Sequence, residues 1–274
     1  MQIGSNSMAQ TAVNALHAAN SAMATATERI STGLRINRAS DDPVGLMVGN
    51  RLKTQITSMV KAIDNVNQGV AMTQIVDSSL SKMVELLGNM RVAAVAAESS
   101  SASTSDRTGY QDAVDAYVNE LDSISDNATW SGTSLMSTAA SVDIQSGTES
   151  GNTITIDFSK ITATVLGLDS LSVSSATNAS SAVDSIDTAL DTVSQYQSYM
   201  GAMANVMTTH NDLLTGVSTN YSSAYGNIMN ADLAQETANL ASAQILGDGA
   251  TAMLAQSNSM DQAIVTYLLR SYTA

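Results

Sequence analysis

The sequence predicts a mainly α protein of long helices with a small β-hairpin region. Apolar residues recur at alternating steps of three and four over most of the 274 residues, which is the spacing of one stripe on a helix. Only 4% of the residues are aromatic and there is a single Pro, so thin layers of close-packed helices are favoured over a thick globular interior. One short region changes to a period of two, which is typical of strands.

Five helical patterns follow one another along the chain. The first has the three-four spacing of a coiled-coil seam, the second begins after Pro43, and the fourth keeps its spacing without a slip. The last is a second seam, so strong helical patterns lie at both ends. The patterns cover residues 9–30, 56–87, 114–124, 183–228 and 246–267. The first seam comprises Ala9, Ala12, Leu16, Ala19, Met23, Ala26 and Ile30, and the last comprises Leu246, Ala250, Met253, Ser257, Met260, Ile264 and Tyr267.

The period changes to two between residues 141 and 158. The segments VDIQ and TITIDF flank the turn-rich GTESGN, in which Gly147, Gly151 and Asn152 supply residues that turns favour. This pattern predicts a hairpin that covers the helices.

The stretch ISTGLRINRASDDPVG predicts a connector between the first two helices. Gly33 suits the left-handed position that ends a helix, and Asp42 followed by Pro43 is typical of a helix start. Arg35 and Arg38 are expected to neutralise the acidic C-terminal half of the chain. Adjacent carboxylates before a Pro favour a helix cap over a catalytic pair.

Charge and composition exclude several classes of function. The net charge is −14, and bases are not clustered as nucleic-acid binding requires. The chain has no Cys, so disulfides, thiolate chemistry and Cys-type zinc sites are excluded. The first residues lack the basic start and continuous apolar stretch of a secretory signal, and no apolar segment has the length of a membrane span.

The two ends of the chain are almost uncharged. Residues 1–27 contain no charged side chain, and residues 233–269 contain only Glu236, Asp248 and Asp261. A helix on the surface of a monomer normally has a charged face, so the outward side of these helices is expected to contact protein. Burying one Leu or Met stabilises by roughly 1.5–3 kcal/mol, whereas ordering costs about 1–2 kcal/mol per residue. We therefore expect the ends to become ordered only on assembly.

Several blocks of the sequence resemble bacterial flagellin, in the same order and over essentially the whole chain. They are ISTGLRINRASDDPVGLMVGNRL, NQGVAMTQIVDSSL, the hairpin with LGLDSLSV, and NADLAQETANLASAQILGDGATAMLAQSNS. The resemblance implies long antiparallel helices in nested coiled-coil or bundle layers. Residues 1–33 and 232–274 would form an inner coiled coil, residues 34–42 a connecting spoke, and residues 43–231 an outer rod with the hairpin. Only about two dozen residues separate Phe158 from Val183, so the variable outer domains of many flagellins are absent.

The resemblance also implies a function. The chain would be a structural subunit that polymerises head-to-tail into the flagellar filament for swimming motility. Its partners would be copies of itself, the flagellar cap, hook-associated proteins and an export chaperone. It would be exported by a type III apparatus without a cleavable signal peptide, and it would need no cofactor or metal. The implied inner-core residues are Leu16, Met23, Ile30, Leu246, Met253, Met260 and Ile264, and the implied connector residues are Gly33, Arg35, Arg38, Asp42 and Pro43.

Two alternatives stay open. The segment SDDP is somewhat similar to the hook-filament junction protein, although AQIL and MLAQSNS favour flagellin. A secreted adhesin-like rod would need a distinctive exposed patch, and the sequence shows none. Enzyme activity is not expected, because His17 and His210 are the only histidines and the HExxH motif of metalloprotease-bearing flagellins is missing.

The segment LLGNMRVAAVAAE resembles the flagellin region that a vertebrate Toll-like receptor senses. Three side chains carry that recognition in the family, an Arg, a Leu and a Glu, and the matching positions here are Asn89 and Ala93, with Arg91 nearby, and Glu120 further along the chain. Losing a guanidinium and a large apolar anchor should weaken recognition. We predict weak receptor activation, and a reporter-cell response as strong as that to an enteric flagellin would contradict this.

Overall fold

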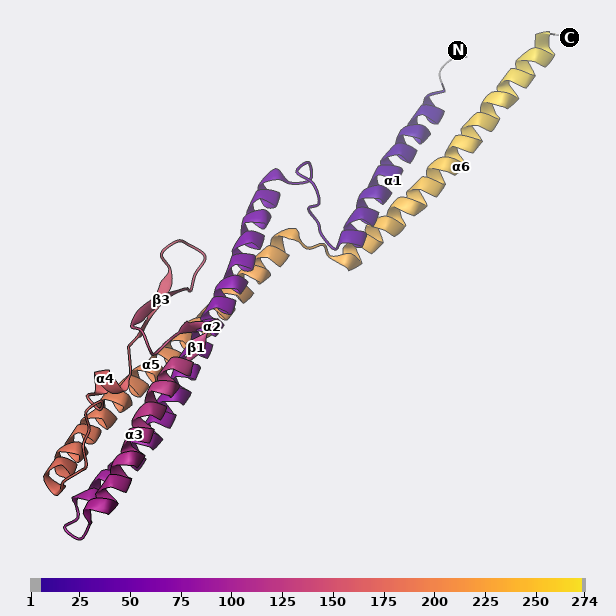
Figure 1. Ribbon diagram of the computed structural model, residues 1–274. Coiled ribbons are helices and arrows are strands. Elements are labelled where there is room, and N and C mark those ends of the chain that lie inside the picture. The colour runs from indigo at the N-terminus through magenta and orange to yellow at the C-terminus, as the bar shows by residue number, and fades with distance from the viewer. Residues whose placement is uncertain (1–5, 273–274) are drawn as a thin grey trace. The chain divides into compact units, whose positions relative to one another are not determined.

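The computed structural model describes residues 6–272, with only the backbone described at 268, 271 and 272. Within that range the chain is mainly helical with short antiparallel strand pairs, so the predicted fold class is confirmed (Figure 1). The outermost residues of the predicted inner domain, 1–5 and 273–274, lie outside this description. The elements are α1 (Ser7–Thr32), α2 (Pro43–Glu98), α3 (Thr104–Asn127), β1 (Thr129–Trp130), β2 (Thr133–Ser134), β3 (Ala140–Gln145), β4 (Thr153–Phe158), α4 (Ala163–Leu166), α5 (Ala176–Met229) and α6 (Leu233–Tyr272).

The chain divides into two compact units, and helices α2 and α5 contribute to both. The terminal unit contains residues 1–54 and 220–274, and the central unit contains residues 55–219. The predicted boundaries at residues 33, 42 and 231 lie at the ends of helices, whereas the compact units divide inside α2 and α5. The three-part division into inner domain, connector and rod therefore stays a prediction.

In the central unit, α2 and α5 run antiparallel. Side-chain contacts link residues of increasing number on α2 to residues of decreasing number on α5, namely Asn67 to Asn211, Ser81 to Gln197 and Arg91 to Asp187. The core is built largely from Leu and Met, whose flexible chains fill gaps between helices without aromatic rings. Its largest fully buried helical side chains are Leu80, Met83, Leu87, Met90, Leu121, Ile186, Met200 and Met207.

The hairpin of β3 and β4 lies in the central unit and buries one face. Residues Ile154, Ile156 and Phe158 of β4 are buried, and the residues between them are exposed, as a period of two requires. The hydroxyl oxygen of Tyr196 on α5 accepts a hydrogen bond from the backbone N–H of Ser159 at 2.8 Å, which fixes the end of the hairpin against the helix. Burial raises the pKa of Tyr196 to about 12.

A second hairpin, formed by β1 and β2, has no counterpart in the sequence prediction. Trp130 pairs with Thr133 across a turn in which Ser131 and Gly132 both have positive φ, 49° and 82°. Two left-handed residues in a two-residue loop are typical of the turns that fit the twist of a hairpin. The Ser-Gly pair in the sequence is compatible with such a turn. The two flanking strands are too short to show the period of two that identifies a strand.

Gly69 on α2 allows close approach of α5 and β3. A Cβ at this position would lie 2.7 Å from Met207 Sδ and 3.3 Å from Ile144 Cγ1. We expect Gly69→Ala to lower the free energy of unfolding by about 1 kcal/mol, because overpacking outweighs the gain in helix propensity. Unfolding in urea, followed by the fluorescence of the single Trp130, measures the change.

Gly201 provides the matched control for Gly69. It is exposed on α5, and a Cβ there would meet no atom within 4 Å. Gly201→Ala should therefore raise the free energy of unfolding by about 1 kcal/mol, the difference in helix propensity between the two residues. Equal effects of the two substitutions would show that packing at Gly69 is not limiting.

Candidate assembly surface on the terminal helices

Helices α1 and α6 lie side by side (Figure 1). They pack through small side chains. The buried residues recur every seven positions on each helix, as in a coiled-coil seam, but they are too small to bury much apolar area. On α1 they are Ala12, Ala19 and Ala26, and on α6 they are Ala243, Ala250 and Ser257, preceded in the same repeat by the buried Glu236. Small side chains thus bring the two helices close together with little hydrophobic stabilisation.

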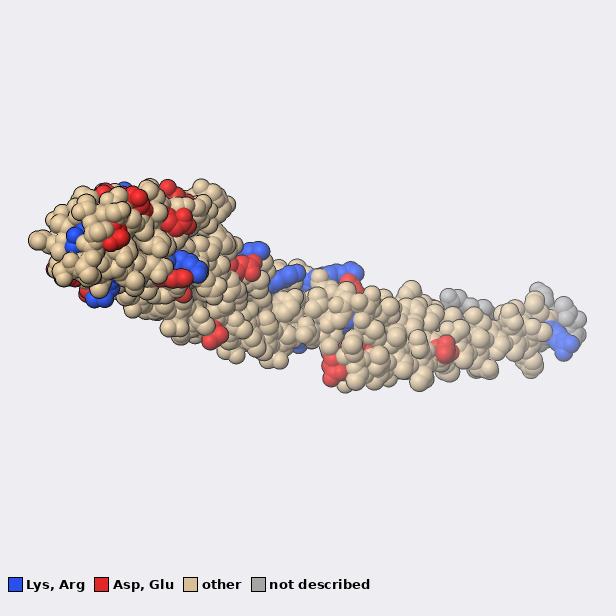
Figure 2. All heavy atoms as spheres, turned by 60° about the horizontal axis from the view of Figure 1, so that its bottom comes forward, with Lys and Arg blue, Asp and Glu red and all other residues tan. Residues whose placement is uncertain are grey.

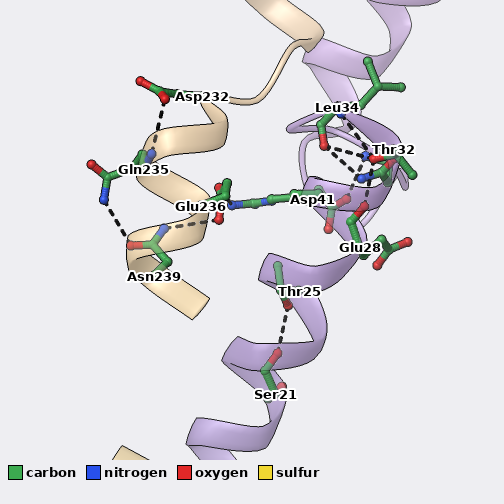
Figure 3. A network of polar contacts seen from close by, with 12 residues as sticks. Ser21, Thr25, Glu28, Thr32, Leu34, Asp41, Asp232, Gln235, Glu236 and Asn239 are labelled. Atoms are coloured by element: carbon green, nitrogen blue, oxygen red, sulfur yellow. Dashed lines mark hydrogen bonds and ion pairs between the residues drawn. The ribbon is translucent and has the colours of Figure 1, made fainter. Parts of the chain in front are cut away.

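Polar contacts fix the pair in an antiparallel register. Arg29 Nη1 lies 2.9 Å from Glu236 Oε1, and the Glu236 side chain is only 10% exposed. Figure 3 shows Glu236 between the two helices, with Asn239 one turn further along α6 donating to its other carboxylate oxygen at 3.2 Å. At the far end of the pair, Asn6 Nδ2 donates to Ser257 Oγ at 2.6 Å. These contacts join the start of α6 to the last turn of α1, and the start of α1 to the middle of α6.

The large apolar residues of α6 lie outside this pairing. Leu246, Met253, Met260 and Tyr267 also recur every seven residues, yet they are 66%, 55%, 47% and 75% exposed. The sequence pattern places them in one seam with Ala250 and Ser257, whereas the structure buries only those two small residues on α1. Ile264 is exposed as well, and Leu16, Met23 and Ile30 of α1 are half-buried. The implied inner-core residues therefore leave considerable apolar surface without a partner in the monomer.

An open groove of about 1210 Å³ runs between the two helices. Its floor is lined by alanines of α1 such as Ala15 and Ala22, and its α6 side is lined by Ile245, Leu246 and Met253. Charged atoms are sparse along the terminal helices on the face shown in Figure 2. A long apolar groove with little charge is a surface that binds protein.

The implied connector residues lie in or directly beside the segment between α1 and α2, with Gly33 as the C-cap of α1 and Pro43 as the first residue of α2. Gly33 ends α1 with φ of 70°, and the Asp42 carboxylate accepts the N–H groups of Val44 and Gly45 at the start of α2, just after Pro43. The connector also reaches the end of α5, where Leu34 and Asn230 form an antiparallel β-bridge. These contacts lie within the terminal unit.

The two connector arginines bind differently from the expectation that they neutralise the acidic C-terminal half. Arg38 binds both carboxylate oxygens of Glu28, which belongs to α1, at 2.9 and 3.0 Å. Arg35 Nη2 donates to the carbonyl oxygen of Ile228 at 2.8 Å. The backbone N–H groups of Arg38 and Asn37 lower the pKa of Asp41, so its carboxylate holds the connector loop together.

The receptor-like positions lie in the central unit. Asn89 and Glu120 are exposed, whereas Ala93 is buried. Arg91 forms a two-pronged ion pair with Asp187, at 2.6 and 3.2 Å, which lowers the pKa of that carboxyl. Weak receptor activation stays a prediction.

Metal binding and membrane crossing were the two other roles to consider for the described residues. No group of three or more His, Cys, Asp or Glu side chains among them is placed to bind a metal ion. None of the helices in that part of the chain combines the length and hydropathy that crossing a membrane requires.

Comparisons with known proteins match both terminal regions. Residues 3–141 match the family described as the bacterial flagellin N-terminal helical region, and residues 183–268 match the bacterial flagellin C-terminal helical region. Flagellin of Halalkalibacterium halodurans is 32% identical over 246 residues, which cover 89% of this chain and 90% of the relative. Phase 2 flagellin of Salmonella abortus-equi is 31% identical over 254 residues, and the match covers 91% of this chain. The chain spans only 51% of the length of that Salmonella relative, in agreement with a short flagellin.

A solved structure has the same fold. It is assigned as a flagellar hook-associated protein from Vibrio parahaemolyticus and superposes on 69% of this chain and 100% of its own with a TM-score of 0.60. The sequences are 14% identical, so this likeness shows the fold alone. Flagellins are structural proteins and not enzymes. Both terminal regions match flagellin families, and one flagellin relative is matched over 90% of its length. The chain therefore belongs to the bacterial flagellin family and is a structural subunit of the extracellular flagellar filament.

Proposed function

We propose that the chain polymerises head-to-tail with copies of itself into a helical tube, and that the exposed face of α6 is the contact surface inside the tube. One observation carries this proposal: Leu246, Met253, Met260 and Tyr267 form a heptad stripe that stays largely exposed among the residues that the structure describes. Contacts between different patches on two copies do not close on themselves, so their repetition produces a filament. The filament transmits motor torque to the surrounding fluid.

The energetics favour a neighbouring copy as the partner of this stripe. The α1–α6 seam buries mainly methyl groups, each of which contributes about 0.8 kcal/mol. Each Leu or Met of the stripe would contribute roughly 1.5–3 kcal/mol when buried. Most of the hydrophobic free energy of the ends is thus available only in the assembly. Ile264 lies on α6 close to the same stripe and is exposed as well, whereas Leu16, Met23 and Ile30 of α1 are half-buried.

The predicted domain division fits this scheme. Residues 1–33 and 232–274 would form the inner tube, residues 34–42 the connector, and residues 43–231 the surrounding rod with its hairpin. The flagellar cap, hook-associated proteins and an export chaperone are further partners that the family implies, and export through a type III apparatus belongs to the same proposal. Binding to these partners and passage through the export apparatus require the two ends of the chain to be accessible before the tube encloses them.

Truncation tests the proposal. Removing residues 1–33 or residues 232–274 should abolish the growth of short filament seeds, measured by light scattering and electron microscopy. The single Trp130 in the central unit reports whether the rest of the chain stays folded. Seeded growth by either folded truncation would remove the ends from the assembly surface.

A further inference from the structure

We infer that the first turns of α2 form a second contact surface, the α2-start patch of Val44, Met47 and Arg51, which binds the acidic central unit of a neighbouring copy. This inference rests on the proposed self-assembly and names a contact outside the terminal helices. The spacing of three and four puts the three side chains on one stripe of α2.

The patch is apolar and exposed. Val44 and Met47 are each 64% exposed, among the most exposed large apolar side chains in the chain. The opposite side of α2 is occupied, since a Cβ on Gly49 would lie 2.4 Å from Met229 Sδ of α5. The stripe therefore faces away from the packing within the terminal unit. Two exposed apolar residues beside an arginine match the composition of interface centres, where Met and Arg are enriched.

Arg51 is available for a partner, unlike the arginines around it. Arg29 binds Glu236, Arg38 binds Glu28, and Arg35 binds the carbonyl of Ile228. Arg51 is exposed and has no ion-pair or hydrogen-bond partner among the residues that the structure describes. A guanidinium next to exposed apolar groups is well suited to an acidic protein surface, which it can bind through two parallel hydrogen bonds.

The central unit supplies the complementary charge. Residues 55–219 contain five Lys or Arg and eighteen Asp or Glu, a net charge of −13, whereas the remaining residues sum to −1. Central units of neighbouring copies therefore repel one another, and acidic side chains are conspicuous on the face in Figure 2. A basic and apolar patch on one copy reduces this repulsion when it binds the acidic unit of the next. In a filament made of one protein, the acidic central unit of a neighbouring copy is available to the α2-start patch of every subunit.

A single thiol tests whether the patch is covered. The chain has no Cys, so Met47→Cys introduces a unique maleimide target, and Ser100→Cys in the exposed α2–α3 loop is the control. We expect the maleimide to label position 47 at least about tenfold more slowly in filaments grown from the purified protein than in the monomer. Labelling at position 100 should slow much less. Filaments in which position 47 reacts as fast as in the monomer overturn the inference and leave the proposed self-assembly intact. Failure of the wild-type chain to extend seeds contradicts the self-assembly itself.

Charge reversal tests whether the partner is acidic. Arg51→Glu should slow seeded growth about tenfold at low salt, whereas Arg51→Lys, which keeps the charge, should slow it much less. The deficit of Arg51→Glu should shrink to about threefold or less near 0.5 M salt, because charges farther apart than the Debye length are screened. An Arg51→Glu deficit that does not change with salt, or the absence of a deficit, overturns the acidic partner. The melting temperature of each monomer verifies that the variants fold.

Discussion

Met253→Asp is expected to abolish the addition of subunits to filament seeds. Met253 lies in the middle of the exposed stripe, between Leu246 and Met260, and is 55% exposed in the monomer. Burying it in the tube contributes roughly 1.5–3 kcal/mol, and burying an unpaired carboxylate instead costs several kcal/mol. A combined loss of about 4 kcal/mol raises the critical concentration nearly a thousandfold. Light scattering after seeding, with electron microscopy of the products, measures the effect.

Two variants control for the substitution itself. Val165 on α4 is 53% exposed and lies in the central unit, so Val165→Asp introduces the same charge at a similarly exposed position outside the proposed inner surface. Met253→Leu keeps the apolar volume at the stripe. Both should extend seeds at close to the wild-type rate. If Met253→Asp grows as well as these controls, the exposed stripe of α6 does not line the tube.

Periodicity predicted the long helices well, because each buries a continuous apolar stripe. The pattern over residues 183–228 lies within α5, which spans Ala176–Met229, and the period-two region at 141–158 coincides with β3 and β4. Local end signals could also be read, since Gly33 and Asp42 act through their own backbone or carboxylate and need no distant partner. These features depend on residues close together in the sequence.

Features that depend on distant residues could not be predicted. The three-four spacing puts Ala250 and Met253 on one stripe, and only the small side chains of α1 decide that Ala250 is buried and Met253 is not. The partner of Glu236 is Arg29, which lies 207 residues away. The exposed stripe of α6 forms most of the candidate site. It could not be predicted from the sequence, because its exposure depends on how α1 packs on α6.

Glu236→Ala is expected to open the α1–α6 pair in the monomer. The mutation leaves Arg29, whose side chain is 28% exposed, without its carboxylate in a mostly buried position. Breaking a buried ion pair costs about 3–5 kcal/mol, and the partial exposure of Arg29 reduces this to about 2 kcal/mol. The seam of alanines provides little to offset that loss. Amide hydrogen exchange in the last turns of α1 should accelerate about 30-fold, since local opening sets the exchange rate.

A mutant cycle and a stabilising variant separate the ion pair from helix packing. Arg29→Ala alone should have a similar effect, and the double variant should accelerate exchange by much less than the product of the two, because each single change removes the same interaction. Gly247 lies in the same interface, where an added Cβ would lie 3.6 Å from Met23 Cε and 3.8 Å from Ala19 Cβ, both ordinary contact distances. Gly247→Ala should therefore slow exchange about fivefold, through a gain of about 1 kcal/mol in helix propensity. Additive effects of Arg29→Ala and Glu236→Ala would show that the two side chains act independently and that their ion pair does not hold the end of α1 on α6.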